Sequence, residues 1–184
     1  TKENATIYKT INGTHLLLKW LHQFIGSNRY ILQPYLHLRT PARLPFDIRV
    51  LMQKDEHRAW QRTGTAVRIG SESSLTSNLH GGGRAERYAS FMKRMDFDRD
   101  TRRKIDQDIR TICTQLPVLI EQEHGRLCEL GIDIGIDRDG RVWLLEVNSK
   151  PGRQVFRKTG EWEVYYTAIK RPVLYAHALV GGRI

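Results

Sequence analysis

Two apolar segments joined by an Asp-Gly pair constrain the fold of this chain more than any other feature. Residues 127–137 and 141–148 are rich in Ile, Val, Leu and Trp, and Asp139-Gly140 lies between them. An Asp-Gly pair between two such segments is a strong signal for a β-hairpin, because both residue types tolerate the backbone of a tight turn. The segment therefore predicts two antiparallel strands with a two-residue turn.

A two-residue turn fixes which residues of the two strands lie opposite each other. Ile132 then lies opposite Val147, and Asp133 lies opposite Glu146. The first pair belongs to a wholly apolar face, as expected for the side of a sheet that packs on a core. The same register also pairs Ile136 with Trp143, and Ile134 with Leu145.

The other face of this hairpin carries polar side chains at the far end of the strands. Two carboxylates directly across a strand pair repel each other, so a cation should lie between Asp133 and Glu146. Asn148 lies two residues beyond Glu146, on the same face. These three oxygen-bearing side chains suit a hard cation such as Mg²⁺. The alternative is a solvated pair of carboxylates in which Arg153 or Lys150 supplies the positive charge.

The rest of the chain predicts an α+β fold, an antiparallel sheet with packed helices. Apolar periodicity predicts helices over residues 16–25, 85–94, 99–125 and 161–180, and strands over residues 29–36, 46–53 and 59–69. Pro117 should kink or divide the third helix, and Pro172 should interrupt the last one.

Composition restricts the class of protein. The net charge is +10, which indicates an anionic partner, either nucleic acid or a phosphate-bearing ligand. Aromatic residues are not interleaved with clustered Arg and Lys, which makes nucleic acid the weaker candidate. Cys113 and Cys128 are the only cysteines and form no CxxC pair, so a reduced, cytoplasmic protein is expected. No apolar run approaches the length of a membrane span.

Several motifs resemble those of ATP-grasp enzymes, in the order found in ligases of the RimK type. They are DIRVLMQ at 47–53, AVRIG at 66–70, TSNLHGGG at 76–83, GIDIG at 131–135 and WLLEVNSKPG at 143–152. The residues of the last motif are most similar to those of the endospore coat-associated YheC/YheD branch. The resemblance extends over residues 28–180 and strengthens the metal interpretation of the hairpin.

The resemblance implies a role for individual residues. Asp133, Glu146 and Asn148 would hold one or two Mg²⁺ ions that join the phosphates of ATP. Leu144, expected on the metal face, would pack under the adenine. The implied adenine-reading hinge is Gln33, Tyr35 and Leu36. Arg49 would contact the γ-phosphate or an acyl phosphate, and Arg68, Asn78 and the glycine loop at 81–83 would line the acceptor site.

The implied activity is an ATP- and Mg²⁺-dependent ligase that joins a carboxylate to an amine or thiol through an acyl phosphate. Residues 1–27 would be part of an amino-terminal subdomain, and residues 28–184 the nucleotide- and metal-binding subdomain. No Lys with a Gly-rich phosphate loop precedes the hinge, so the chain is expected to be the carboxy-terminal portion of a longer enzyme. The alternatives are a non-catalytic, spore-coat-associated protein that keeps this fold, and a basic nucleic-acid-binding domain.

Overall fold

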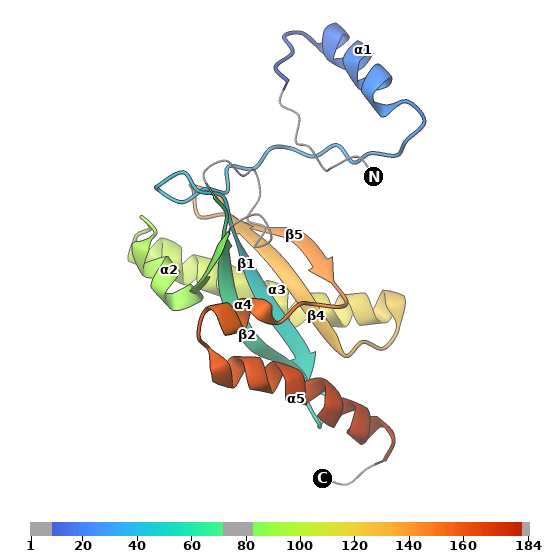
Figure 1. Cartoon of the computed structure of the whole chain (residues 1–184), viewed down its shortest axis with the longest axis vertical. Coiled ribbons are helices and arrows are strands. Elements are labelled where there is room, and N and C mark those ends of the chain that lie inside the picture. Colours follow the sequence, from blue (N-terminus) through green and yellow to red (C-terminus); the bar gives the residue numbers. More distant parts are fainter. Residues whose placement is uncertain (1–8, 72–82, 182–184) are drawn as a thin grey trace. The chain divides into compact units, whose positions relative to one another are not determined.

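A computed structural model describes residues 9–71 and 83–181. The chain divides into two compact units, Thr1–Leu36 and His37–Ile184, and each is described by itself. The division falls after Leu36, later in the chain than the domain boundary predicted after Ser27. In the second unit lie all the strands and all but one of the helices of the described residues (Figure 1).

The first unit contains the helix α1, Thr14–Ile25, which confirms the helix predicted at 16–25. The helix ends at Gly26, whose φ of 53° is a left-handed conformation that favours glycine. The strand predicted at 29–36 is wrong, since these residues are irregular. Strand residues need a neighbouring strand for their backbone hydrogen bonds, and none pairs with this segment among the described residues.

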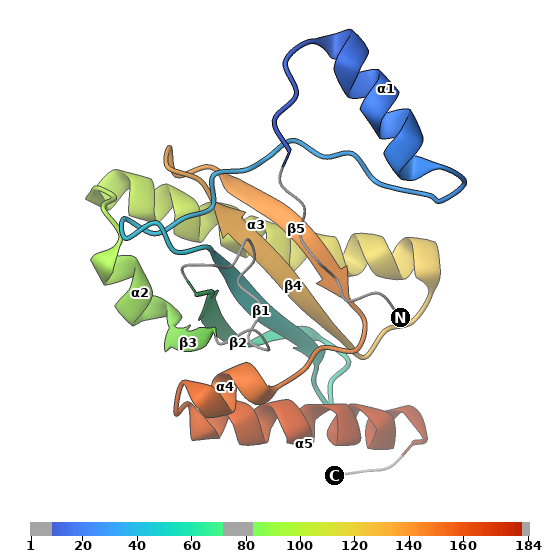
Figure 2. The same ribbon diagram turned by 45° about the horizontal axis from the view of Figure 1, so that its top comes forward.

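The second unit is built on a five-stranded antiparallel sheet with the strand order β3-β2-β1-β4-β5. Figure 2 shows β5 at one edge of this sheet and β3 at the other. The sheet confirms the predicted α+β fold, both hairpins and the strands around them. The strands are β1 (Phe46–Lys54), β2 (Trp60–Ile69), β3 (Arg84–Arg87), β4 (Glu129–Ile136) and β5 (Val142–Asn148).

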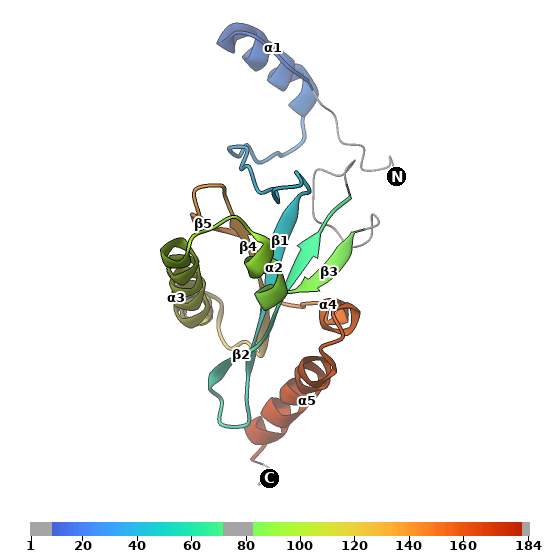
Figure 3. The same cartoon turned by 90° about the vertical axis from the view of Figure 1, so that its left-hand side faces the viewer.

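Helices cover the two faces of the sheet unequally (Figure 3). On one face, α2 (Tyr88–Arg94) and α3 (Arg99–His124) pack on the main core, which contains Ile48, Val50, Ile132, Ile134, Phe91, Ile105, Ile109 and Cys113. On the other face, α4 (Gln154–Lys158) and α5 (Trp162–Leu179) bury a smaller cluster of Leu51, Ala66, Val155, Phe156 and Ala168. The small cluster leaves the part of this face around Asp47, Arg49 and Asp133 outside the apolar core.

Three predicted helices differ in detail from the observed ones. The helix predicted at 85–94 begins only at Tyr88, because the preceding residues, Arg84–Arg87, pair with β2 and form the edge strand β3. The helices α3 and α5 continue through Pro117 and Pro172. A proline removes one backbone hydrogen bond, and the packing of the whole helix on the sheet outweighs that loss. The short helix α4 was not predicted.

The β4–β5 turn is one residue longer than predicted. The backbone N–H of Asp137 donates to the carbonyl of Arg141 at 3.1 Å, and Gly140 donates to the carbonyl of Asp137 at 3.1 Å. Gly140 has a φ of 76°. These features describe a three-residue loop, a type I turn followed by a left-handed glycine.

An irregularity farther along the hairpin restores the predicted register. Next to the turn, Ile136 pairs with Val142 and Ile134 pairs with Leu144, so the pairings predicted for these two isoleucines are wrong. The register then shifts between Asp133 and Ile134, and Asp133 lies opposite Glu146 as predicted. The extra residue in the turn and the bulge in β5 compensate for each other.

Candidate metal- and phosphate-binding site

Charged side chains from three neighbouring strands lie on one face of the sheet. In β1, the residues Phe46, Ile48 and Val50 enter the main core, so alternation places Asp47 and Arg49 on the opposite face. The register aligns Asp47 with Arg68 of β2, and Arg49 with Asp133 of β4. Two cross-strand pairs of opposite charge therefore lie side by side.

These four residues form one hydrogen-bonded network. The guanidinium of Arg49 donates two hydrogen bonds to Asp133, from Nε to Oδ1 and from Nη2 to Oδ2, the latter at 2.8 Å. Arg68 bridges the two acids, since its Nη2 donates to Oδ2 of Asp133 at 2.8 Å and its Nε donates to Oδ1 of Asp47 at 2.6 Å. Asp133 is only 3% exposed and Arg49 only 9%. The network is thus largely shielded from solvent, where charge pairing is strong.

Burial and pairing shift two pKa values in this network. Burial raises the pKa of Asp47 to about 6, although the hydrogen bond from Arg68 opposes the rise. Burial by itself would lower the pKa of Arg68, but the hydrogen bond and the charge of Asp47, with those of Asp133, raise it above its usual value. Arg68 therefore stays charged, while Asp47 is the group that can take up a proton near neutral pH.

The two arginines pair with Asp133, and among the described residues neither pairs with Glu146. The sequence alternative was that Arg153 or Lys150 supplies the positive charge for the two carboxylates, and for Arg153 the structure shows other partners. Its Nη2 pairs with Glu129 at 2.6 Å, and its Nε donates to the carbonyl of Ala168 at 2.8 Å. Arg153 therefore fastens α5 to the sheet rather than serving Asp133.

Glu146 and Asn148 are the open part of the site. Glu146 lies opposite Asp133, and Asn148 lies opposite Gly131. Glu146 is exposed and Asn148 half-buried. Within residues 9–71 and 83–181, neither side chain makes a hydrogen bond. Their oxygen atoms are consequently available to an added ligand.

The segment after β5 lies close over β4 because of a glycine. A Cβ added to Gly131 would lie 2.7 Å from the Cβ of Pro151, closer than such atoms come in proteins. Gly131 and Asp133 lie two residues apart in β4 and therefore on the same face of the sheet. The glycine lets the backbone after β5 come close to this face beside the charged residue. Pro151 therefore lies close over Gly131, two residues from Asp133 along β4.

The donor set fits one hard cation beside Glu146. An ionised carboxylate offers about four lone-pair positions, and the two arginines use three of those on Asp133. One position remains on Oδ1, and the register places Glu146 opposite Asp133 and Asn148 opposite Gly131. No group of three or more His, Cys, Asp or Glu is placed to hold a metal within the described residues. The candidate ligands are the two carboxylates of Asp133 and Glu146 and the amide of Asn148.

The roles of the other predicted binding residues stay predictions. Leu144 lies opposite Ile134 and is 46% exposed, and the adjacent bulge means that alternation from Glu146 does not define the direction of its side chain. The hinge residues Gln33, Tyr35 and Leu36 belong to the first unit. Asn78, Gly81 and Gly82 lie outside the described residues.

Sequence reasoning missed the part that Asp47 plays. The predicted hairpin of residues 46–53 and 59–69 already contained the necessary signal, because Asp47 and Arg68 each interrupt an apolar alternation. The strand register of that hairpin pairs Asp47 with Arg68. The bridge from Arg68 to Asp133 was harder to foresee, since it depends on β1 lying between β2 and β4.

Comparison with known proteins shows the family of this chain. A family model described as "YheC/D like ATP-grasp" matches residues 1–179. The chain belongs to the YheC/D-like ATP-grasp family. This ATP-grasp chain is 34% identical over 174 residues to "Endospore coat-associated protein YheC" of Bacillus subtilis (strain 168). It is 32% identical over 135 residues to "Endospore coat-associated protein YheD" of the same organism.

The two alignments cover the ATP-grasp chain more fully than they cover the relatives. The first spans 93% of this chain and 45% of YheC, and the second spans 73% of this chain and 29% of YheD. The chain therefore spans less than half the length of the curated relatives it matches. Among the helices of the described residues, none combines the length and apolar character that crossing a bilayer requires.

Proposed function

We propose that this ATP-grasp chain provides the metal- and phosphate-binding part of an ATP-dependent ligase. Family membership supports the ATP-grasp class. The observation that carries the proposal is the pairing of Asp133 with Glu146 across β4 and β5, next to the buried Arg49 and the half-buried Arg68. A sheet that served only as a scaffold would gain nothing from two carboxylates in opposed positions.

The proposed reaction has two steps. A substrate carboxylate oxygen attacks the γ-phosphorus of ATP, so that ADP leaves and an acyl phosphate forms. An amine or thiol then attacks the acyl carbon, and inorganic phosphate leaves. Neither step needs a covalent nucleophile from the protein, so the side chains act by positioning and by neutralising charge.

The side chains divide this work. Glu146, Asn148 and Oδ1 of Asp133 would hold Mg²⁺, which supplies positive charge to the phosphates when it is bound. Arg49 and Arg68 donate hydrogen bonds to Asp133 and fix its direction. Each guanidinium has five N–H donors and uses two of them here, so both retain donors for a phosphoryl or carboxylate oxygen.

The remaining predicted residues complete the proposal. Gln33, Tyr35, Leu36 and Leu144 would contact the adenine, and Asn78 with the glycine loop would close over the acceptor. Residues 1–27 and 28–184 would correspond to parts of two ATP-grasp subdomains. The names of the two relatives support an association of this chain with the spore coat, following synthesis in the cytoplasm.

A second candidate is a coat-associated protein that keeps the fold without turnover. The observation that favours it is the network itself, because two arginines already satisfy the charge of Asp133. Such a site is stable without an added ion. In this version Glu146 and Asn148 are solvated, and ATP with Mg²⁺ does not bind.

Calorimetric titration with ATP separates the two candidates. The ligase proposal expects binding that requires Mg²⁺ and that Glu146→Gln weakens at least about tenfold, since a charged ligand of the ion is lost. Glu123→Gln is the matched control, because Glu123 is also exposed and lies at the far end of α3. Binding that does not depend on Mg²⁺, or that both variants leave unchanged, would overturn the proposed site. No binding of ATP in the presence of Mg²⁺ would favour the second candidate.

A further inference from the structure

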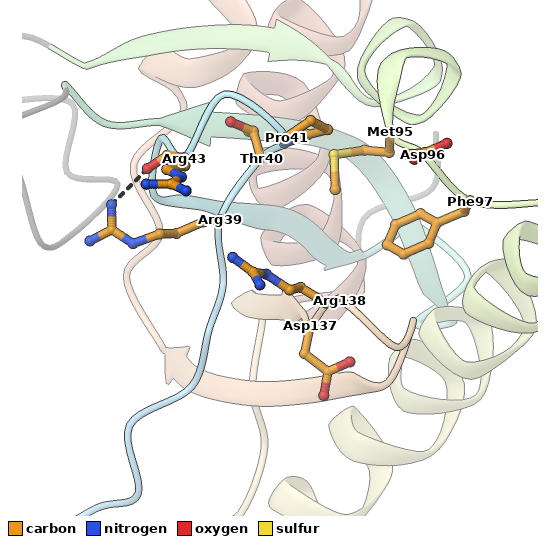
Figure 4. Close-up of a pocket in the computed structure, with 9 residues that line it drawn as sticks. All are labelled: Arg39, Thr40, Pro41, Arg43, Met95, Asp96, Phe97, Asp137 and Arg138. Atoms are coloured by element: carbon orange, nitrogen blue, oxygen red, sulfur yellow. Dashed lines mark hydrogen bonds between the residues drawn. The ribbon is translucent and has the colours of Figure 1, made fainter.

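A pocket outside the ATP-grasp site lies at the turn end of the β4–β5 hairpin. Its cavity volume is about 390 Å³, within the usual range for small-molecule sites. The walls come from the loop before β1, the connection between α2 and α3, and the hairpin turn, all in the second unit. The lining residues are Arg39, Thr40, Pro41, Arg43, Met95, Asp96, Phe97, Asp137 and Arg138 (Figure 4).

Three guanidinium groups give the pocket its charge. Arg39 donates from Nη1 to the carbonyl of Arg43 at 2.6 Å, a bond within the loop before β1. In the part of the chain that the structure describes, the side chains of Arg43 and Arg138 have no acidic partner. Figure 4 shows the guanidinium of Arg138 reaching toward the middle of the pocket. The positive charge is therefore available to a ligand.

The two acids in the lining do little to neutralise these arginines. The carboxylate of Asp137 accepts hydrogen bonds from the backbone N–H groups of Asp139 and Arg141, and from the indole of Trp143 at 2.9 Å. It is therefore committed to the turn. Asp96 is exposed, and Figure 4 shows its carboxylate directed away from Arg138.

Arg43 adopts a backbone conformation that arginine rarely takes. Its φ is 60°, in the left-handed region where glycine is the easiest residue. The loop is held by the backbone N–H of Arg43, which donates to the carbonyl of Thr40 at 2.8 Å, and by two further bonds between Thr40 and Leu44. A glycine would fit this loop with less strain. The chain carries a long cationic residue there instead, and this residue lines the pocket.

The opposite wall of the pocket is apolar. Met95 is buried in the main core, and Phe97 is half-buried against it. Figure 4 shows the ring of Phe97 and the thioether of Met95 facing Arg138 across the pocket. Cations on one side and an aromatic ring with a polarisable sulfur on the other suit a ligand that has an anionic end and a flat, apolar end.

We propose that this pocket binds a small organic anion with a phosphate group beside an aromatic ring. The phosphate meets Arg43 and Arg138, and the ring lies against Phe97 and Met95. The pocket is separate from the proposed metal site, because Asp137 lies four residues beyond Asp133 along β4, a distance of about 13 Å at the rise of an extended strand.

Titration calorimetry with phenyl phosphate tests this proposal on the whole chain. Arg138→Gln and Arg43→Gly should each weaken binding about tenfold or more, because each removes a charged hydrogen-bond donor to the phosphate. Arg43→Gly should also leave the melting temperature unchanged or raised, since it relieves a strained backbone. This second readout separates a binding role from a structural one.

Matched controls make the outcome decisive. Arg58 is the other non-glycine residue with a positive φ in the described chain, at 65°, and it is not part of the pocket. Arg58→Gly removes the same charge from the same conformation and should bind phenyl phosphate like the unmodified protein. Glu146→Gln should also bind it normally, which keeps this test apart from that of the metal site. Inorganic phosphate should bind about tenfold more weakly, because it lacks the ring.

Three results would overturn the proposal. The first is no binding of phenyl phosphate by the unmodified protein at millimolar concentrations. The second is an equal loss of affinity in Arg43→Gly and Arg58→Gly, which would indicate attraction by net charge alone. The third is equal affinity for inorganic phosphate and phenyl phosphate, which would remove the aromatic part of the ligand.

Discussion

Replacing Asp133 with Asn should destabilise the protein in the absence of any metal. Asp133 is 3% exposed and accepts three hydrogen bonds from two guanidinium groups. Arg68 would keep its hydrogen bond to Asp47, but Asp133 is the only side chain that accepts hydrogen bonds from Arg49 among the described residues. Leaving a buried charge without its partner costs about 3–5 kcal/mol. Because Asn still offers one acceptor oxygen, we expect a loss of about 3 kcal/mol in the free energy of unfolding.

Two further variants turn this value into a ranking. Arg49→Met should destabilise less than Asp133→Asn, because Asp133 would still be held by Arg68 at 2.8 Å. Glu146→Gln should change the free energy of unfolding by no more than about 0.5 kcal/mol, since Glu146 is exposed and makes no ion pair in the described structure. A slight gain is expected there, because a carboxylate opposite Asp133 is removed.

Urea-induced unfolding, followed by circular dichroism with EDTA present, measures all three variants. The slopes of the transitions should agree, so that the midpoints report stability alone. A loss below about 1 kcal/mol for Asp133→Asn would show that the network does not hold the sheet together. A loss of about 2 kcal/mol or more for Glu146→Gln would show that Glu146 has a cationic partner in solution, which the structure does not contain.

The remaining predictions concern pH, backbone spacing and turnover. Relative to Asp47→Asn, the unmodified protein should lose up to about 3 kcal/mol of stability between pH 4 and 6. The raised pKa of about 6 means that the folded form favours protonated Asp47, so this stability is present at low pH and lost as pH rises; urea unfolding at several pH values measures it. Gly131→Ala should cost about 1–3 kcal/mol in thermal unfolding because its Cβ would meet Pro151 at 2.7 Å, whereas Gly152→Ala, with no atom within 4 Å, should change little. In the complete enzyme, Arg49→Met should lower the rate of ATP-dependent phosphate release about a hundredfold per folded molecule, and a change within twofold would contradict a phosphate role.

Much of the candidate site could be predicted from the hairpin alone. Alternation in β4 and β5 placed the isoleucines on a core face, and it placed Asp133 opposite Glu146, as the structure confirms. That prediction succeeded although the turn has three residues, because a bulge next to Asp133 restored the register. The pairings between the bulge and the turn were wrong for the same reason. A period of two is robust over a strand, but each inserted residue exchanges its faces.

The sequence by itself determined the hairpins, the long helices and the charges that alternate with the core residues. These follow from local periodicity and turn chemistry, which act over a few residues. The tertiary structure alone decided that Arg49 and Arg68 both bind Asp133, and that Arg153 binds Glu129 instead. Those pairings depend on β1 lying between β2 and β4, and on α5 reaching the sheet. Strand order and helix docking are set by burial of apolar surface far apart in the chain, which no local pattern records.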